Sequence, residues 1–298
     1  MKWVFGFLLG SFCLTMVLFD SAWADGGNSY PNGLEGIKAA SVPPPGYYYR
    51  MYTLFYNPDT LTDKRGKELD LDFDLSIIVN AHRFLWVSDY KILGADYAAD
   101  IAVPLMNVDL EIGKLGVDES TFGLGDIFLE PLVLGWHGDF YDAAFGAGIF
   151  VPCGKYDADD PASPGSGMWT GMVTLGGTLY FDPAKSLSAS ILARYEIHGE
   201  QDETEVTKGD DFHFEWGIGK TIKEVWDVGM AGYCQWQVTE DDGPGASDVK
   251  DSVYSFGPEV NYMIPSQKIL LTFRGLTEFG AEDRTEGHQI ILIFTKIF

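Results

Sequence analysis

Phe-Gly-Leu-Gly-Asp-Ile-Phe-Leu-Glu-Pro-Leu-Val-Leu-Gly-Trp-His-Gly-Asp-Phe-Tyr-Asp-Ala-Ala-Phe-Gly-Ala-Gly-Ile-Phe-Val-Pro occupies residues 122–152. Two extended segments meet at His137-Gly138-Asp139, a small polar turn of the kind that closes β-hairpins. In the second segment, alternate residues form an apolar face, namely Tyr141, Ala143, Phe145, Ala147, Ile149 and Val151. The opposite face is small or acidic, with Asp142, Ala144, Gly146 and Gly148. Each arm reaches the about 9–11 residues of a tilted membrane strand, so the hairpin predicts one unit of a closed transmembrane β-barrel.

The chain begins with the features of a secretory signal peptide, residues 1–24. Lys2 supplies a positive charge, residues 3–19 are nearly all apolar, and Ala22-Trp23-Ala24 forms a small-x-small cleavage site. A membrane anchor would need a positive stop-transfer flank, and none follows. Cys13 comes after Phe12 rather than a small residue, which argues against a lipoprotein anchor. We therefore predict export.

The chain of 298 residues is strongly acidic, with a formal net charge of -24. This acidity argues against nucleic-acid binding, because phosphates need Lys and Arg partners. A hydrophobic content of 46% suits either a soluble β protein or an outer-membrane barrel. Composition leaves both open, since only alternate residues of a barrel strand face lipid.

Residues 25–46, which we call the leader, are rich in Gly, Pro and small residues and show no periodicity. Two interpretations stay open for the leader: a disordered periplasmic tail, or a short plug folded back into the barrel mouth. Residues 47–298 are predicted to form an all-β, antiparallel, up-and-down barrel of the outer-membrane type. Its twelve predicted strands are residues 47–56, 71–87, 96–105, 126–136, 140–151, 170–181, 187–198, 212–220, 226–238, 253–264, 268–279 and 288–298.

The connections favour a barrel over a soluble sandwich. Long acidic connections alternate with short ones along the whole chain, as expected for a barrel whose two chain termini lie in the periplasm, with long loops outside and short turns inside. The long set is 57–70, 107–123, 153–169, 199–211, 239–251 and 280–287, and the short set is 88–95, 137–139, 182–186, 221–225 and 265–267. The long set holds much of the acidic excess, and its carboxylates predict divalent cations as partners near the cell surface.

The strand ends also fit a membrane barrel. Phe298, with Phe294, Leu292 and Ile290 on the same face, resembles the C-terminal strand signal of bacterial outer-membrane proteins. Aromatic residues near strand ends fit interfacial girdles, although they would also suit a core: Tyr47, Tyr48, Trp86, Trp136, Trp169, Trp226 and Trp236.

No enzyme motif is complete. Gly219-Lys220-Thr221 resembles the end of a phosphate-binding loop, but Phe214 stands where its first glycine belongs. The five histidines show no metal-ligand spacing. His198 with Ser188 or Ser190 comes nearest to a hydrolase pair, and nothing in the spacing requires it. We predict no catalytic residues, no metal and no cofactor.

Several segments resemble the family named for the meta-pathway of phenol degradation. They are Tyr30-Pro31-Asn32-Gly33-Leu34-Glu35-Gly36, Pro43-Pro44-Pro45-Gly46-Tyr47, Arg83, Leu93-Gly94-Ala95, Gly123-Leu124-Gly125-Asp126-Ile127, Leu134-Gly135-Trp136-His137 and Pro152-Cys153-Gly154-Lys155-Tyr156. The resemblance covers nearly the whole mature chain. It implies an outer-membrane channel associated with uptake of aromatic and other hydrophobic compounds, without a settled substrate or set of transport residues. Cys153 departs from the threonine that the family has there, which puts nothing essential in doubt.

Taken together, these features predict passive, substrate-gated uptake of a small hydrophobic or aromatic solute across the outer membrane. A structural or general-diffusion barrel is the alternative, and a lipid-acting outer-membrane enzyme is a distant third. Lipid and lipopolysaccharide would surround the barrel. Strand parity gives the candidate lumen and transport residues: Arg194, Glu196, His213, Glu215, Gln235, Gln237, Glu259, Asn261, Arg274 and Glu278. These side chains could equally pair with one another and fill the lumen, with Arg194 and Arg274 as partners for Glu196, Glu215 and Glu259.

Overall fold

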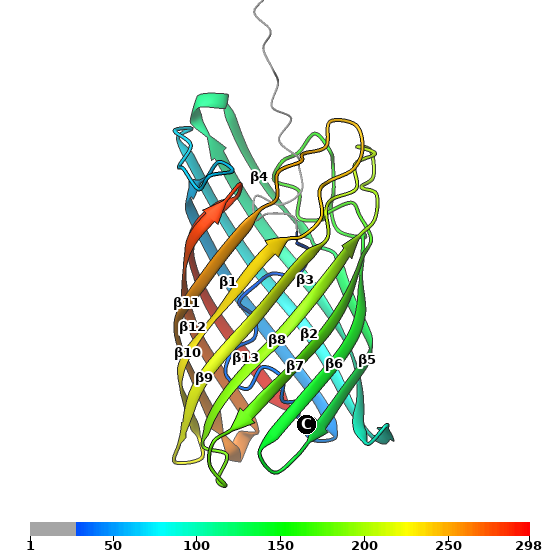
Figure 1. Cartoon of the computed structure of the whole chain (residues 1–298), viewed down its shortest axis with the longest axis vertical. Helices are drawn as coiled ribbons and strands as arrows, with labels where there is room; N and C mark the ends of the chain where they lie inside the picture. The colour runs from blue at the N-terminus through cyan, green and yellow to red at the C-terminus, as the bar shows by residue number, and fades with distance from the viewer. Residues whose placement is uncertain (1–27) are drawn as a thin grey trace, which may run out of the picture.

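The computed structural model describes residues 28–298 and shows a single closed β-barrel (Figure 1). The predicted signal peptide, residues 1–24, lies outside the described residues. Within residues 28–298, none of the helices has the length and apolar character needed to span a membrane.

Residues 28–298 form thirteen β-strands in one antiparallel sheet. The strands are β1 (Gly46–Leu61), β2 (Phe73–Ile92), β3 (Ala95–Ile112), β4 (Val117–Leu124), β5 (Ile127–His137), β6 (Tyr141–Val151), β7 (Thr170–Tyr180), β8 (Leu187–His198), β9 (Asp211–Ile222), β10 (Trp226–Gln237), β11 (Ser252–Ile264), β12 (Ile269–Glu282) and β13 (Thr285–Ile297). Strands that follow one another in the chain pair with each other, except β4 and β5, and β1 pairs with β13 to close the barrel. Closure leaves no open sheet edge in the hydrocarbon layer, where an unpaired backbone group would be costly.

The thirteen strands of the described chain occupy twelve positions, because β4 and β5 both pair with β3 and follow one another along it. The pairing is interrupted at Gly125 and Asp126, which separate the two strands. The prediction of a twelve-strand antiparallel barrel is therefore confirmed. β4 itself lies in the connection predicted for residues 107–123, which is a β-hairpin turning through the 3₁₀ helix η1 (Gly113–Leu115) rather than a loop.

The alternation of connections between the two ends of the barrel holds, with two differences in length. The connections predicted for residues 88–95 and 280–287 are each only two residues long. The short connections lie together at one end of the barrel, the short-turn end, and the tightest of them is Leu93-Gly94. The long connections lie at the opposite, long-loop end (Figure 1). The connection predicted for residues 280–287 is wrong in length, because β12 and β13 continue until only Asp283 and Arg284 separate them.

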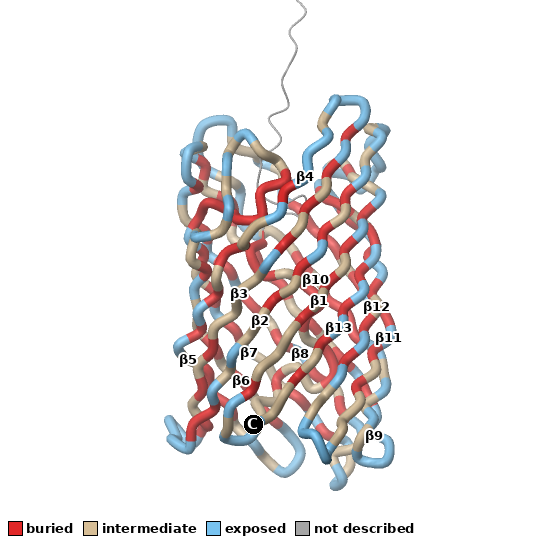
Figure 2. The backbone as a smooth tube through the Cα atoms, turned by 180° about the vertical axis from the view of Figure 1, so that it is seen from behind, coloured by how far each residue is buried: buried red, intermediate tan, exposed pale blue. Residues whose placement is uncertain are grey.

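Burial alternates along the strands in the sense that a membrane barrel requires (Figure 2). On β8, the polar Arg194 and Glu196 are buried, whereas the apolar Ile191 and Ile197 are exposed. Lipid therefore meets the apolar face and the polar face lines the lumen. One residue predicted for the aromatic girdle, Tyr48, instead points inward and donates its hydroxyl to the carbonyl oxygen of Pro44 at 2.6 Å.

The described part of the leader, residues 28–45, runs inside the barrel from the long-loop end to the short-turn end (Figure 1). Near the long-loop end, Ser29 hydrogen-bonds the hydroxyl of Thr170, the first residue of β7, at 2.9 Å. Near the short-turn end, Lys38 forms an ion pair with Asp227 at 3.0 Å. The chain then enters the barrel wall at Gly46, the first residue of β1. The leader therefore lies inside the barrel wall and directly precedes its first strand.

Candidate functional site: the barrel lumen

The leader lies against one wall of the lumen, formed by β8 to β12, and is held there through its backbone. Glu196 accepts a hydrogen bond from the amide of Ser29 at 2.7 Å, and Glu215 accepts one from the amide of Glu35 at 2.9 Å. Glu259 accepts one from the amide of Ile37 at 3.1 Å. A buried backbone segment outside a sheet needs other acceptors for its N–H groups. Three carboxylates on three strands supply them here.

Small residues let the leader approach this wall closely. A Cβ built on Gly219 of β9 would come 2.7 Å from the side chain of Ile37, and one on Gly217 would meet the backbone of Gly36 and Ile37. Glycine at these positions leaves room for another backbone to pass. Strand β9 is therefore shaped to receive the leader.

Ion pairs across neighbouring strands neutralise the charges of this wall. Arg194 of β8 contacts Glu215 of β9 at 2.6 Å, and Arg274 of β12 contacts Glu259 of β11 at 2.9 Å. Arg274 and Glu259 stand directly opposite one another in the register, the arrangement in which cross-strand pairs interact. Sequence parity anticipated these two partnerships, whereas Glu196 contacts His213 at 2.8 Å rather than an arginine.

Three of the remaining sequence-predicted lumen residues belong to the same hydrogen-bonded wall. The side-chain oxygen of Gln235 accepts from the side-chain NH₂ of Asn32 at 3.2 Å, and Asn261 donates to Glu259 at 2.8 Å. Glu278 accepts from the hydroxyl of Tyr56 at 2.8 Å. Gln237 lies apart, half-buried at the long-loop end, where it donates to Asp241 at 2.7 Å.

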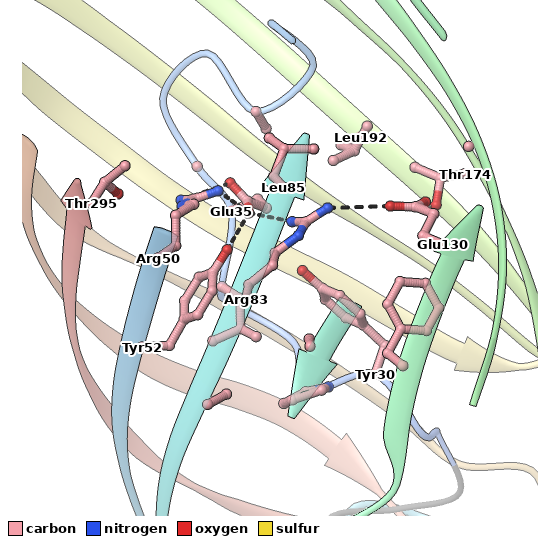
Figure 3. Close-up of a pocket in the computed structure, with 18 of the residues that line it drawn as sticks. Tyr30, Glu35, Arg50, Tyr52, Arg83, Leu85, Glu130, Thr174, Leu192 and Thr295 are labelled. Carbon is pink, nitrogen blue, oxygen red and sulfur yellow. Dashed lines mark hydrogen bonds and ion pairs between the residues drawn. The ribbon is translucent and has the colours of Figure 1, made fainter. Parts of the chain in front are cut away.

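A second charged cluster lies on the other side of the leader, and the sequence analysis missed it (Figure 3). The carboxylate of Glu35 in the leader contacts Arg50 of β1 at 2.7 Å and Arg83 of β2 at 3.5 Å. It also accepts a hydrogen bond from the hydroxyl of Tyr52 at 3.1 Å. Arg83 in turn contacts two strand carboxylates, Asp100 at 2.6 Å and Glu130 at 3.2 Å.

The signal for this cluster was present in the sequence. Arg50 and Tyr52 share the inward parity of β1, and Arg83 lies in the middle of a predicted strand. Alternation is clearest late in the chain, which directs attention to β8 to β12, and the leader has no periodicity that would show which wall it packs against. The partners of Glu35 therefore do not follow from the sequence.

A cavity of about 410 Å³ opens beside the Glu35 cluster. Its lining comes from the leader and from strands β1 to β3, β5 to β8 and β10 to β13, and the part contributed by β1 to β3 and β5 to β8 is mostly apolar. The apolar lining includes Val79, Ala81, Leu85, Ala102, Met106, Phe128, Val133, Phe150 and Met172. Polar groups line the cavity at the Glu35 cluster and at Arg194, whose guanidinium carbon lies 3.8 Å from the ring centroid of Tyr30. Further polar lining residues lie on β10 to β12, namely Asp227, Glu259, Asn261, Thr272 and Arg274. The lumen is thus polar along the wall that holds the leader and, apart from the Glu35 cluster, mainly apolar on the opposite side.

The surroundings of His198 and the spacing of metal-ligating side chains bear on the hydrolase and metal alternatives. His198 hydrogen-bonds Thr170 at 2.9 Å and Asp211 at 3.0 Å, rather than Ser188 or Ser190. Among residues 28–298, no three His, Cys, Asp or Glu side chains lie close enough together to hold a metal ion.

A closed antiparallel barrel with an apolar outer face and a polar lumen defines a bacterial outer-membrane β-barrel protein. Solved structures of this class share its fold. The COG4313 outer membrane channel from Pseudomonas putida F1 matches with a TM-score of 0.77 and 13% identity over 91% of this chain and 100% of that chain. The β domain of the Bordetella autotransporter BrkA matches with a TM-score of 0.51 and 10% identity over 85% of this chain and 99% of that chain.

The sequence itself identifies the family. The family model described as "Putative MetA-pathway of phenol degradation" matches residues 58–294, and the chain belongs to this family. The resemblance noted in the sequence is thereby confirmed. None of the curated proteins compared with the chain matches it.

Proposed function

We propose that this outer-membrane barrel is a channel for passive uptake of small hydrophobic or aromatic compounds. The observation that carries the proposal is the cavity of about 410 Å³ inside the lumen, with a mainly apolar wall on one side and polar groups on the leader's side and at the Glu35 cluster. Small-molecule sites commonly have this size and make-up. A channel also needs binding that is favourable on the way in and weak enough for release. Membership of the family and the fold shared with an outer-membrane channel support the same function.

In this proposal residues 1–24 are a signal peptide, residues 25–46 are a leader that plugs the lumen, and residues 47–298 are the barrel. Support for a plug comes from the hydrogen bonds that Glu196, Glu215 and Glu259 accept from the leader. Most of the candidate residues on the polar wall, among them Glu196, Glu215 and Glu259, would then act mainly by holding the leader, and the solute would pass along the apolar wall. Opening requires the leader to shift away from one of these walls.

The proposal includes no enzymatic step. The Thr170 hydroxyl that faces His198 also bonds Ser29 of the leader, so this group is part of the lumen packing. Lipid and lipopolysaccharide are the proposed surroundings of the barrel. The acidic long loops are proposed to attract divalent cations there, because carboxylate oxygens suit such ions.

Uptake by cells tests the function. A porin-deficient Gram-negative host is given radiolabelled toluene, with and without the protein in its outer membrane. We expect faster initial uptake with the protein. Ala102→Trp, which fills the cavity, should reduce the uptake, and Val103→Trp on the outer face of the same strand should not. Equal uptake with and without the protein would refute the proposal. Equal acceleration of glycerol would favour the general-diffusion alternative.

A further inference from the structure

We propose that Arg50, Arg83 and Tyr52 form a carboxylate-binding site at the polar end of the cavity, which Glu35 of the leader occupies in the closed channel. Monocarboxylates with a compact apolar body, such as aromatic acids, then open the channel more readily than uncharged aromatic solutes do. This inference rests on the proposed channel function and names its substrate class.

The geometry around Glu35 is that of a bound carboxylate. Arg50 donates from Nη1 to Oε1 at 2.7 Å and from Nη2 to Oε2 at 3.4 Å, so each nitrogen faces its own oxygen. Two parallel contacts of this kind give a guanidinium its selectivity for planar anions. Tyr52 adds a hydroxyl donor at 3.1 Å, and Arg83 adds a second positive charge at 3.5 Å. All three donors come from the barrel, whereas the acceptor comes from the leader (Figure 3).

The two arginines differ in what else holds them. Arg83 is fixed by Asp100, through contacts of 2.9 Å and 2.6 Å, and by Glu130 at 3.2 Å. Within residues 28–298, the carboxylate that pairs with Arg50 is Glu35, and the guanidinium otherwise lies 4.9 Å from the ring centroid of Tyr52. Withdrawal of Glu35 would therefore leave a partly buried positive charge without its counter-ion. Such a state is unfavourable unless another anion replaces the lost one.

The space beside the site fits the rest of such a solute. The cavity continues from the Glu35 cluster over apolar residues of β2, β3 and β5, including Leu85, Ala102 and Phe128. One solute could thus place its carboxylate against Arg50 and its apolar body against this wall. The exchange replaces one carboxylate by another, so the lumen keeps its charge balance while the leader is released.

The acidic long loops repel an anionic solute that approaches the barrel mouth, and this repulsion has a measurable consequence. The chain carries a net charge of -24, which lowers the local concentration of anions at the mouth. At physiological salt, repulsion is screened beyond about 8 Å, so the loops act on the rate of approach and not on contacts inside the lumen. Uptake of an aromatic acid should accordingly become faster as ionic strength rises.

Calorimetry on the purified full chain in detergent tests the site, with benzoate as the probe and benzamide as its uncharged analogue. In the wild type, benzoate competes with Glu35, which lowers its apparent affinity. Glu35→Gln should bind benzoate at least about tenfold more tightly than the wild type, because charge-assisted bonds to Arg50 become free. Benzamide should bind both proteins alike. The exposed turn variant Asp139→Asn is the matched carboxylate-to-amide control and should leave both affinities unchanged.

Two further variants keep the test independent of folding. Adding Arg50→Gln to Glu35→Gln should abolish the gain for benzoate, and adding Tyr52→Phe should reduce it, in proteins that still migrate as folded barrels in unboiled gels. The inference is overturned if Glu35→Gln binds benzoate no more tightly than the wild type while toluene uptake persists in cells. Absence of toluene uptake would refute the channel function itself, which is a separate outcome.

Discussion

Replacement of Arg274 by methionine would remove a side chain that holds the leader at two points. The guanidinium of Arg274 donates one hydrogen bond to the carbonyl oxygen of Gly33 and another, at 2.9 Å, to Glu259. The same oxygen of Glu259 accepts from the amide of Ile37 at 3.1 Å. Both side chains of the pair are 3% exposed or less, so water cannot replace the lost contacts at little cost.

The expected magnitude has two parts. A hydrogen bond from a charged group contributes about 1.5–3 kcal/mol, and a loss of about 2 kcal/mol raises the ratio of undocked to docked leader about 30-fold. The barrel as a whole should lose about 3–5 kcal/mol of unfolding free energy, because Glu259 remains buried without its counter-ion. Adding Glu259→Gln removes that uncompensated charge. The double variant should recover much of the stability while the leader stays loosely held.

Single-channel recordings in planar bilayers measure the first part, and urea unfolding in lipid vesicles measures the second. We expect Arg274→Met to spend a larger fraction of time open than the wild type, and the double variant to remain more open although it is more stable than Arg274→Met. The control Asp139→Asn, in an exposed turn, should behave as the wild type in both assays. If Arg274→Met folds and its open fraction is unchanged, the contacts of Arg274 do not hold the channel closed.

Three further substitutions test the wall, the membrane face and one turn. Gly217→Ala should displace the leader and raise channel conductance, because the added Cβ meets the backbone of Gly36 and Ile37, whereas Gly171→Ala, with open space around it, should not. Ile191→Lys, in the middle of the lipid-facing side of β8, should lower the unfolding free energy in vesicles by about 2–4 kcal/mol. Leu187→Lys, at the end of the same strand, should lower it by only about 0–1 kcal/mol. Equal losses for the two variants would contradict this placement of β8 in the bilayer. The Ser186 hydroxyl and the Leu187 amide, which donate to Asp182, hold the pKa of that turn carboxyl below its usual value. The resulting stability is present above the unfolded pKa of about 3.9 and is lost as the pH falls through the folded pKa. Asp182→Ala should therefore destabilise the barrel at pH about 7 and not at pH about 2. A loss of equal size at both pH values would show that the charge of Asp182 is not responsible.

The wall of the barrel follows from local sequence. Whether a side chain faces lipid or lumen depends on the parity of its own strand, which residues 187–198 display without reference to any other segment. The same holds for the ends of the barrel, since the alternation of long and short connections can be counted along the chain. This is why the outward apolar face, the polar lumen and the twelve positions were all predictable.

The prediction of a loop at residues 107–123 was wrong because the alternation of this segment is not reinforced by an apolar face. Strand β4 lies in a hairpin at the long-loop end, and its residues Asp118, Glu119 and Ser120 are exposed and polar. Its pairing depends on the register with β3, in which Ser120 stands opposite Asp109. A polar extended segment and an acidic loop have the same composition, so the sequence could not separate them.

The amino-acid sequence by itself determined that the chain forms a membrane barrel with a polar lumen, because alternation is a property of each strand alone. Only the tertiary structure decided how that lumen is filled. Gly33 contacts Arg274, and Glu35 contacts Arg83. These contacts form because closure of the barrel arranges strands that are distant in the sequence around one lumen, and the leader runs through that lumen. Contacts of this kind depend on register and circumference together, and neither quantity is encoded within a single strand.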